Sequence, residues 1–184
     1  MLIIYMEESV DTMNAFLTVI PLILIRFGLL SILDKESLKR AAYFAPLIGK
    51  EKTAYWLYQL SNLMIFIYLF FLKIKIDHQW FYIGVLVYGI GVLLCFISVL
   101  DYAKPKENGI NLRGLYRFSR NPMYVAYFIY FLGCVLLTQS LLLFAVLIVF
   151  QVSGHWIILS EERWCVQKFG QEYINYMNNV RRYI

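Results

Sequence analysis

The chain has 184 residues, of which 61% are hydrophobic and only 16% are charged, and its mean hydropathy is +0.63. Soluble globular proteins average about 45–50% apolar and about 25% charged residues, so this composition excludes most soluble folds and indicates a protein of the lipid bilayer. A membrane-spanning helix needs about 20 apolar residues, and several such helices leave no length for a separate soluble domain. We therefore predict one all-α, integral-membrane domain over residues 1–184.

Five apolar stretches with the length of transmembrane helices follow one another along the chain. They cover approximately residues 13–33, 54–72, 80–100, 123–138 and 141–159. Pro21 and Arg26 interrupt the first stretch. The fourth and fifth are separated only by Thr138, Gln139 and Ser140. So short a connection predicts a tight antiparallel helical hairpin.

Lysine and arginine are distributed very unevenly between the predicted spans. Fourteen of the 17 lie in the segments 34–53, 101–122 and 161–184, whereas only Lys73 and Lys75 lie between the second and third spans. Positively charged segments stay preferentially in the cytoplasm. The predicted topology is therefore multi-pass, with the N-terminus outside and the C-terminus in the cytoplasm.

Polar side chains at membrane depth are costly and mark candidate sites. On the fifth predicted helix, Gln151, His155 and Glu162 share one face, while the neighbouring Glu161 points away from it. Two interpretations remain open. The stripe either makes hydrogen bonds between helices and ends in solvated carboxylates, or it forms part of a site.

The segment before the fourth span is rich in polar and aromatic residues. Asn121 is a good helix N-cap and Pro122 suits the first helical position, so the pair predicts a helix start without any ligand. The same helix end, beside Arg117 and Arg120, also suits a carboxylate or phosphate. Capping and anion binding are compatible, and both remain open.

Glycines lie inside the third predicted span, at Gly84, Gly89 and Gly91. Small residues in transmembrane helices usually allow close helix packing. The alternative is a cofactor pressed against the bare backbone at Gly89 and Gly91.

The C-terminal segment 163–184 is predicted to form an amphipathic helix at the membrane surface. Its apolar positions are Phe169, Tyr173, Tyr176 and Val180, which recur at helical spacing. Arg181 and Arg182 at its end are candidates to bind lipid headgroups or an anionic substrate.

Taken together, these residues resemble the integral-membrane methyltransferases of the isoprenylcysteine carboxyl methyltransferase and phospholipid methyltransferase superfamily. The resemblance covers about residues 84–184 and rests on two motifs. The first is Gly114-x-Tyr116-x3-Arg120-Asn121-Pro122-x-Tyr124. The second is Glu161-Glu162 followed by Phe169-Gly170, Tyr173, Tyr176, Val180 and Arg182.

The resemblance implies that S-adenosylmethionine binds at the cytoplasmic side, between the first motif, the last spans and the C-terminal helix. The cofactor-binding residues that it implies are Gly89, Gly91, Gly114, Tyr116, Arg120, Asn121, Pro122, Tyr124, His155, Glu161 and Glu162. Tyr173, Arg181 and Arg182 are predicted to bind the acceptor. The acceptor is expected to be lipophilic and to enter from the bilayer, with membrane lipids as further partners.

The chemical class of the acceptor stays open. A prenylcysteine-like carboxylate is the first choice, although prenylcysteine-specific relatives commonly have His where this chain has Asn121. A phospholipid amine and a small thiol are the alternatives. A carboxylate or thiolate needs little acid or base help, whereas an amine must lose a proton, for which His155 is the candidate base.

A different class of function also remains open, namely a non-enzymatic transporter subunit or assembly factor. Nucleic acid is not an expected partner. The three cysteines show no metal-ligand spacing, so no metal is expected either. The resemblance suggests the plasma membrane of a prokaryote as the location.

Overall fold

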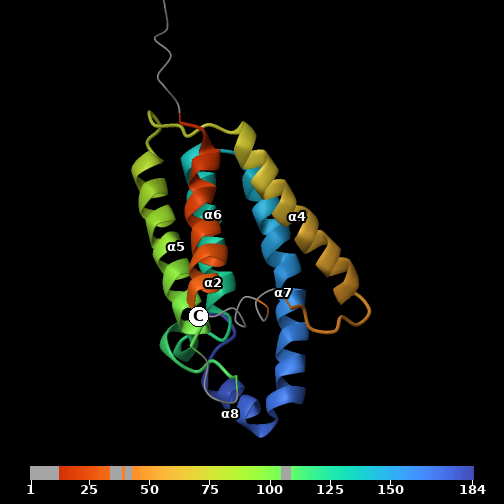
Figure 1. Cartoon of the computed structure of the whole chain (residues 1–184). Helices are drawn as coiled ribbons and strands as arrows, with labels where there is room; N and C mark the ends of the chain where they lie inside the picture. Colours follow the sequence, from red (N-terminus) through yellow and green to blue (C-terminus); the bar gives the residue numbers. More distant parts are fainter. Residues whose placement is uncertain (1–12, 34–38, 40–42, 105–108) are drawn as a thin grey trace, which may run out of the picture.

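The computed structural model describes residues 13–33, 39, 43–104 and 109–184, and every regular element among them is helical (Figure 1). The all-α prediction is confirmed for these residues. Three of the basic residues counted above, Lys35, Arg40 and Lys106, lie outside the described residues.

The first apolar stretch folds as one run of helical turns of changing width. It begins as the 3₁₀-helix η1 (Ala15–Val19) and continues through α1 (Ile20–Ile23), the π-helical segment η2 (Leu24–Leu29) and α2 (Leu30–Leu33). The longer helices that follow are α4 (Glu51–Phe71), α5 (Phe81–Tyr102), α6 (Pro122–Thr138) and α7 (Leu141–Phe169). A 3₁₀-turn, η3 (Gly114–Arg117), precedes α6, and a short helix, α8 (Gln171–Asn179), follows α7.

Four of these helical runs are long and apolar enough to cross a membrane. They are Ala15–Leu33, α4, α5 and α7, and they coincide with four of the five predicted spans. Helix α6 is apolar but has only 17 residues, so it is about 26 Å long at 1.5 Å per residue, against a hydrocarbon core of about 30 Å. The fifth crossing and the hairpin of α6 with α7 therefore stay predictions.

The helix of the fifth predicted span continues beyond residue 159, and α7 ends at Phe169. No glycine or proline interrupts the sequence between these points, and Gly170 is the first residue that can turn the chain, at φ +56°. The amphipathic helix is correspondingly shorter than the predicted segment 163–184. It is α8 alone, because the backbone of Val180 is extended and residues 180–184 form no helix.

Two helix pairs form the body of the protein, α5 with α6 and α4 with α7 (Figure 1). Glycines bring the first pair into backbone contact, since a Cβ added at Gly91 would lie 2.4 Å from Tyr130 Cα. A Cβ at Gly133 would likewise lie 2.5 Å from Tyr88 Cα. In the second pair, the Tyr58 ring stacks on Phe150 with centroids 4.7 Å apart.

The two ends of the bundle contain different segments of the chain. At one end, the Ile74 amide donates to the Met13 carbonyl (2.9 Å) and the Lys75 amide donates to the Leu137 carbonyl (2.9 Å). At the other end lie η3, α8 and the start of α4 (Figure 1). The described parts of the three basic segments thus gather opposite Lys73 and Lys75, as a positively charged cytoplasmic face would require.

Candidate functional site

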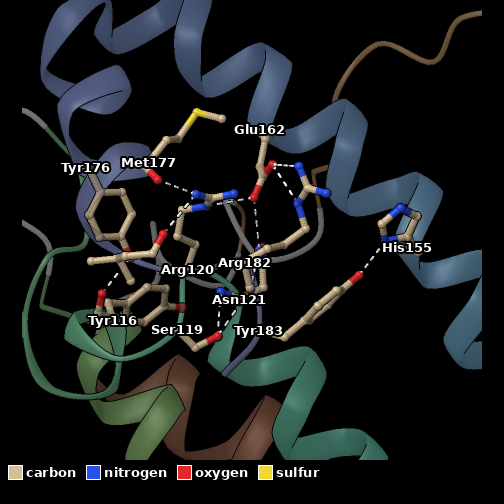
Figure 2. A network of polar contacts seen from close by, with 11 residues as sticks. Tyr116, Ser119, Arg120, Asn121, His155, Glu162, Tyr176, Met177, Arg182 and Tyr183 are labelled. Carbon is tan, nitrogen blue, oxygen red and sulfur yellow. Dashed lines mark hydrogen bonds and ion pairs between the residues drawn. The ribbon is translucent and has the colours of Figure 1, made fainter.

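A buried ion-pair network joins the loop before α6 to α7 and the C-terminal tail (Figure 2). Arg120 Nε donates to Glu162 Oε1 at 3.0 Å, and Arg182 Nη2 lies 2.8 Å from Glu162 Oε2. The Arg120 and Glu162 side chains are only 8% and 4% exposed. Glu162 is therefore held between two guanidinium groups, as a buried carboxylate requires.

Arg120 also binds the end of α8. Its Nη1 donates to the carbonyls of Met177 (2.8 Å) and Val180 (2.9 Å), and its backbone amide donates to the Arg181 carbonyl (2.9 Å). These carbonyls lie at or beyond the helix C-terminus, where no intrahelical donor is available and a cation is favourable. Arg120 thus fixes the tail against the loop.

Asn121 occupies the N-cap position of α6, but its side chain makes no capping hydrogen bond, so the capping interpretation is wrong. Its Nδ2 donates instead to Glu162 Oε1 (3.3 Å) and to the Arg182 carbonyl (3.2 Å). Pro122 is the first residue of α6, as predicted. The Asn121 side chain binds this network and does not cap α6, because Glu162 offers it a charged acceptor.

The first motif begins with a turn that only glycine fits. Gly114 has φ +55°, and a Cβ there would lie 2.0 Å from Asp101 Oδ2, which accepts a hydrogen bond from the Leu115 amide (2.8 Å). The Tyr116 carbonyl accepts from the Tyr176 hydroxyl of α8 (2.6 Å). Burial raises the pKa of the Tyr116 phenol, which is therefore neutral.

Behind this network lies a cavity of about 470 Å³, within the usual range of about 300–1,000 Å³ for small-molecule sites. Both motifs contribute to its lining, with Tyr116, Arg120, Asn121, Tyr124, Glu161 and Glu162. Tyr173 of α8 lines it as well. Seven of the fourteen residues predicted to bind cofactor or acceptor, far apart along the chain, are thus brought to one cavity.

The membrane-side wall of the cavity is aromatic and carries one carboxylate and one guanidinium. The Tyr124 hydroxyl donates to Glu161 Oε1 at 3.0 Å. The Arg26 guanidinium stacks 5.4 Å from the centroid of the Tyr127 ring and donates to the Tyr127 hydroxyl. Tyr58 completes this wall from α4.

Asn111 lines the same cavity and shows an unmet hydrogen-bonding requirement. Its Oδ1 is buried and is the one such side-chain oxygen or nitrogen without a hydrogen-bond partner in the described part of the chain. A buried acceptor without a donor is destabilising. A ligand N–H or O–H in the cavity would satisfy it.

The model of the phospholipid methyltransferase family matches residues 80–172, half of the chain. The chain belongs to this family. No curated protein and no solved structure matches the chain significantly. The resemblance drawn from the motifs is therefore confirmed, and membership of the phospholipid methyltransferase family supports a membrane methyltransferase activity. The matched segment contains Arg120, Glu161 and Glu162, whereas Arg182 lies beyond it.

Other residues that the sequence suggested lie outside the cavity lining of this phospholipid methyltransferase family member. His155 Nδ1 hydrogen-bonds with the Tyr183 hydroxyl at 2.7 Å (Figure 2). Gly91 packs on α6, and a Cβ at Gly89 would meet nothing within 4 Å. The residues absent from the lining are Gly89, Gly91, Gly114, Pro122, His155, Arg181 and Arg182.

Most residues of the membrane-side wall were not predicted from the sequence. Arg26 interrupts the first apolar stretch, and a charge at membrane depth is a signal for a site. Tyr58 and Tyr127 belong to apolar runs in which nothing distinguishes them from lipid-facing aromatics. Asn111 carried no sequence signal at all.

Proposed function

We propose that this protein transfers a methyl group from S-adenosylmethionine to a lipophilic acceptor at the cytoplasmic face of the membrane. The observation that supports this is the convergence of both family motifs on one cavity. The family match also favours an enzyme over a transporter subunit or assembly factor. The excess of basic residues at the same end of the bundle supports the orientation. A prokaryotic plasma membrane remains a prediction.

The residues that line the cavity fit the proposed cofactor. S-adenosylmethionine supplies a methyl group on a sulfonium centre and carries an ammonium group, ribose hydroxyls and an adenine amine. Asn111 Oδ1 can accept from one of these donors, and Glu161 can accept from another. The tyrosine faces, Tyr124 among them, suit a cation.

Arg120 and Glu162 hold the wall of the cavity in this proposal. Their hydrogen bonds go mainly to each other, to Arg182 and to the carbonyls at the end of α8. They are positioning residues, which keep the tail closed over the cavity and exclude water from it. Methyl transfer benefits from such alignment in a water-poor pocket.

A carboxylate acceptor of the prenylcysteine type stays the first choice, because it reacts without losing a proton. The description of the matched family favours a phospholipid amine as the second choice. An amine must be deprotonated first, and Glu161 then takes the role that the sequence suggested for His155, since Glu161 lines the cavity. A small thiol is the third candidate acceptor.

Calorimetric titration of the detergent-purified protein with S-adenosylmethionine tests the proposal. We expect saturable binding that Glu161→Gln weakens at least tenfold, or about 1.4 kcal/mol. Glu172→Gln is the matched control, because Glu172 is exposed on α8 and lies outside the cavity lining. Absence of binding at millimolar cofactor, in protein that is folded and monodisperse, would refute the proposal.

A further inference from the structure

The segment 43–50, which precedes α4, forms one wall of the cavity. Tyr43, Phe44 and Ala45 line the cavity, and residues 43–48 belong to no helix or strand. Figure 1 shows the segment as an orange trace that passes α7 before it enters α4. Lids over ligand sites are drawn from the parts of a protein that open at low free energy. This wall can move without the unwinding of a helix.

An ion pair fastens the segment to α7. Arg163 Nη1 and Nη2 donate to Glu51 Oε1 and Oε2, both at 2.7 Å. This is the two-pronged arrangement in which a guanidinium binds a carboxylate most specifically. Arg163 Nη2 also donates to the Pro46 carbonyl at 3.0 Å. The Ile48 amide donates to Glu51 Oε2 at 2.8 Å. Each partner of the ion pair therefore also binds the backbone of the segment.

Aromatic contacts join the same segment to both neighbouring helices. The Tyr43 ring lies 5.6 Å from the Trp164 ring of α7, measured between centroids, and both residues line the cavity. The Phe44 ring meets the Tyr55 ring of α4 edge-on, with centroids 5.0 Å apart. The segment thus contacts α4 and α7 while it borders the cavity.

The ion pair is placed where it can break and form again. The Arg163 side chain is 35% exposed, so water weakens its attraction to Glu51. The preceding residue, Glu162, is instead bound to Arg120 in a pair whose side chains are only 4% and 8% exposed. Adjacent residues of α7 therefore hold two different segments, the C-terminal tail through a buried pair and the segment 43–50 through a partly exposed one.

We propose that Glu51 and Arg163 are positioning residues, whose ion pair closes the segment 43–50 as a lid over the cavity and breaks to let a ligand pass. A closed lid excludes water, which favours methyl transfer. The identity of the ligand rests on the function proposed above, whereas the movement of the lid does not depend on it.

The rate of thiol labelling measures how often the lid opens. Cys165 lines the same cavity, whereas Cys95 and Cys134 are 1% and 0% exposed inside the bundle and report on loosening of the whole fold. Detergent-purified protein without cofactor is treated with a polar maleimide, and mass spectrometry of peptides follows each cysteine. We expect Arg163→Gln to raise the labelling rate of Cys165 at least tenfold and to leave the other two cysteines unlabelled.

Three further variants make the result specific to the ion pair. Glu51→Gln removes the other charge and should raise the Cys165 rate as well. Arg163→Lys retains the charge but loses the planar fork, so it should give an intermediate rate. These two variants carry the test if Arg163→Gln does not fold. Lys52→Gln is the matched control, because Lys52 is exposed beside Glu51 and lies outside the cavity lining, and it should change nothing.

Two results would overturn the proposal. One is an unchanged Cys165 rate in folded Arg163→Gln and Glu51→Gln proteins. The other is a parallel rise at Cys95 and Cys134, because the ion pair would then stabilise the whole bundle and not the lid.

Failure of the methyltransferase function gives a different pattern. Millimolar S-adenosylmethionine would then leave the Cys165 rate of the original protein unchanged, whereas bound cofactor should slow it. The difference between the original protein and Arg163→Gln, measured without cofactor, would remain and would still support the lid.

Discussion

Gly89 and Gly91 lie two residues apart on α5, yet a methyl group added at each would meet different surroundings. At Gly91 the new Cβ would lie 2.4 Å from Tyr130 Cα and 2.6 Å from Tyr130 N. At Gly89 it would meet nothing within 4 Å. Alanine substitution of the two residues therefore separates helix packing from a direct contact with a cofactor.

The magnitudes follow from two opposing effects. Replacing glycine by alanine in a helix interior gains up to about 1 kcal/mol of helix propensity. At Gly91 the clash is with backbone, so α5 and α6 must move apart, and overpacking of this kind costs typically about 1–3 kcal/mol. We expect Gly91→Ala to lower the free energy of unfolding by about 1–2 kcal/mol, and Gly89→Ala to leave it unchanged or slightly raised.

The assay is thermal or denaturant unfolding in one detergent, followed by calorimetric titration with S-adenosylmethionine. Gly89→Ala should bind the cofactor as tightly as the original protein does, because Gly89 lies outside the cavity lining. A stable Gly89→Ala variant that no longer binds cofactor would refute this reasoning. It would show that the glycine pair contacts the cofactor, as the resemblance implies.

Three further predictions concern the network and the cavity. Glu162→Gln leaves two guanidinium groups without their carboxylate and should lower the free energy of unfolding by about 3 kcal/mol. This is the lower end for such pairs, because the Arg182 side chain is 32% exposed. Limited proteolysis should then cut the C-terminal tail faster, and an unchanged digestion rate would contradict the prediction. Asn111→Leu removes the buried oxygen that has no hydrogen-bond partner, so the free energy of unfolding should stay unchanged or rise by up to about 1 kcal/mol. The affinity for S-adenosylmethionine, measured by titration, should fall about tenfold. His155→Gln should leave kcat/KM for methyl transfer within twofold, because its ring is bonded to Tyr183 outside the cavity lining; a hundredfold loss would restore His155 as a base.

The sequence was sufficient to predict the helical class and the meeting of the two motifs. Hydrophobic runs determine membrane helices directly, and the meeting of the two motifs was implied by the family resemblance. The amphipathic helix was predicted to begin too early, at residue 163, because hydropathy marks where a helix leaves the hydrocarbon and not where its hydrogen bonding stops. Helix α7 ends only before Gly170, whose positive φ turns the chain.

A contact with a residue distant in sequence explains why the Asn121 side chain does not cap α6. Local preference predicts that its side chain caps α6, but Glu162 on α7, 41 positions later in the chain, is a charged acceptor within 3.3 Å. Such a partner is invisible to local pattern reasoning. The same limit applies to Arg26 and Tyr58, which the fold brings from the first two spans to a cavity that the motifs describe only from the second half of the chain.

Different residues form the ion-pair network and the rest of the cavity lining, and this difference bears on specificity for the acceptor. The motif residues Arg120 and Glu162 make hydrogen bonds and ion pairs with the C-terminal tail. Part of that tail, including Arg182, lies beyond the matched family segment. Two residues outside both motifs also line the cavity, namely Arg26 and Asn111, and the buried Oδ1 of Asn111 has no hydrogen-bond partner. Substitution at these positions can change the acceptor without disturbing the network that closes the cavity. Differences in acceptor between proteins that share the motifs should therefore arise at the first span and the loop before η3, where sequence patterns are weakest.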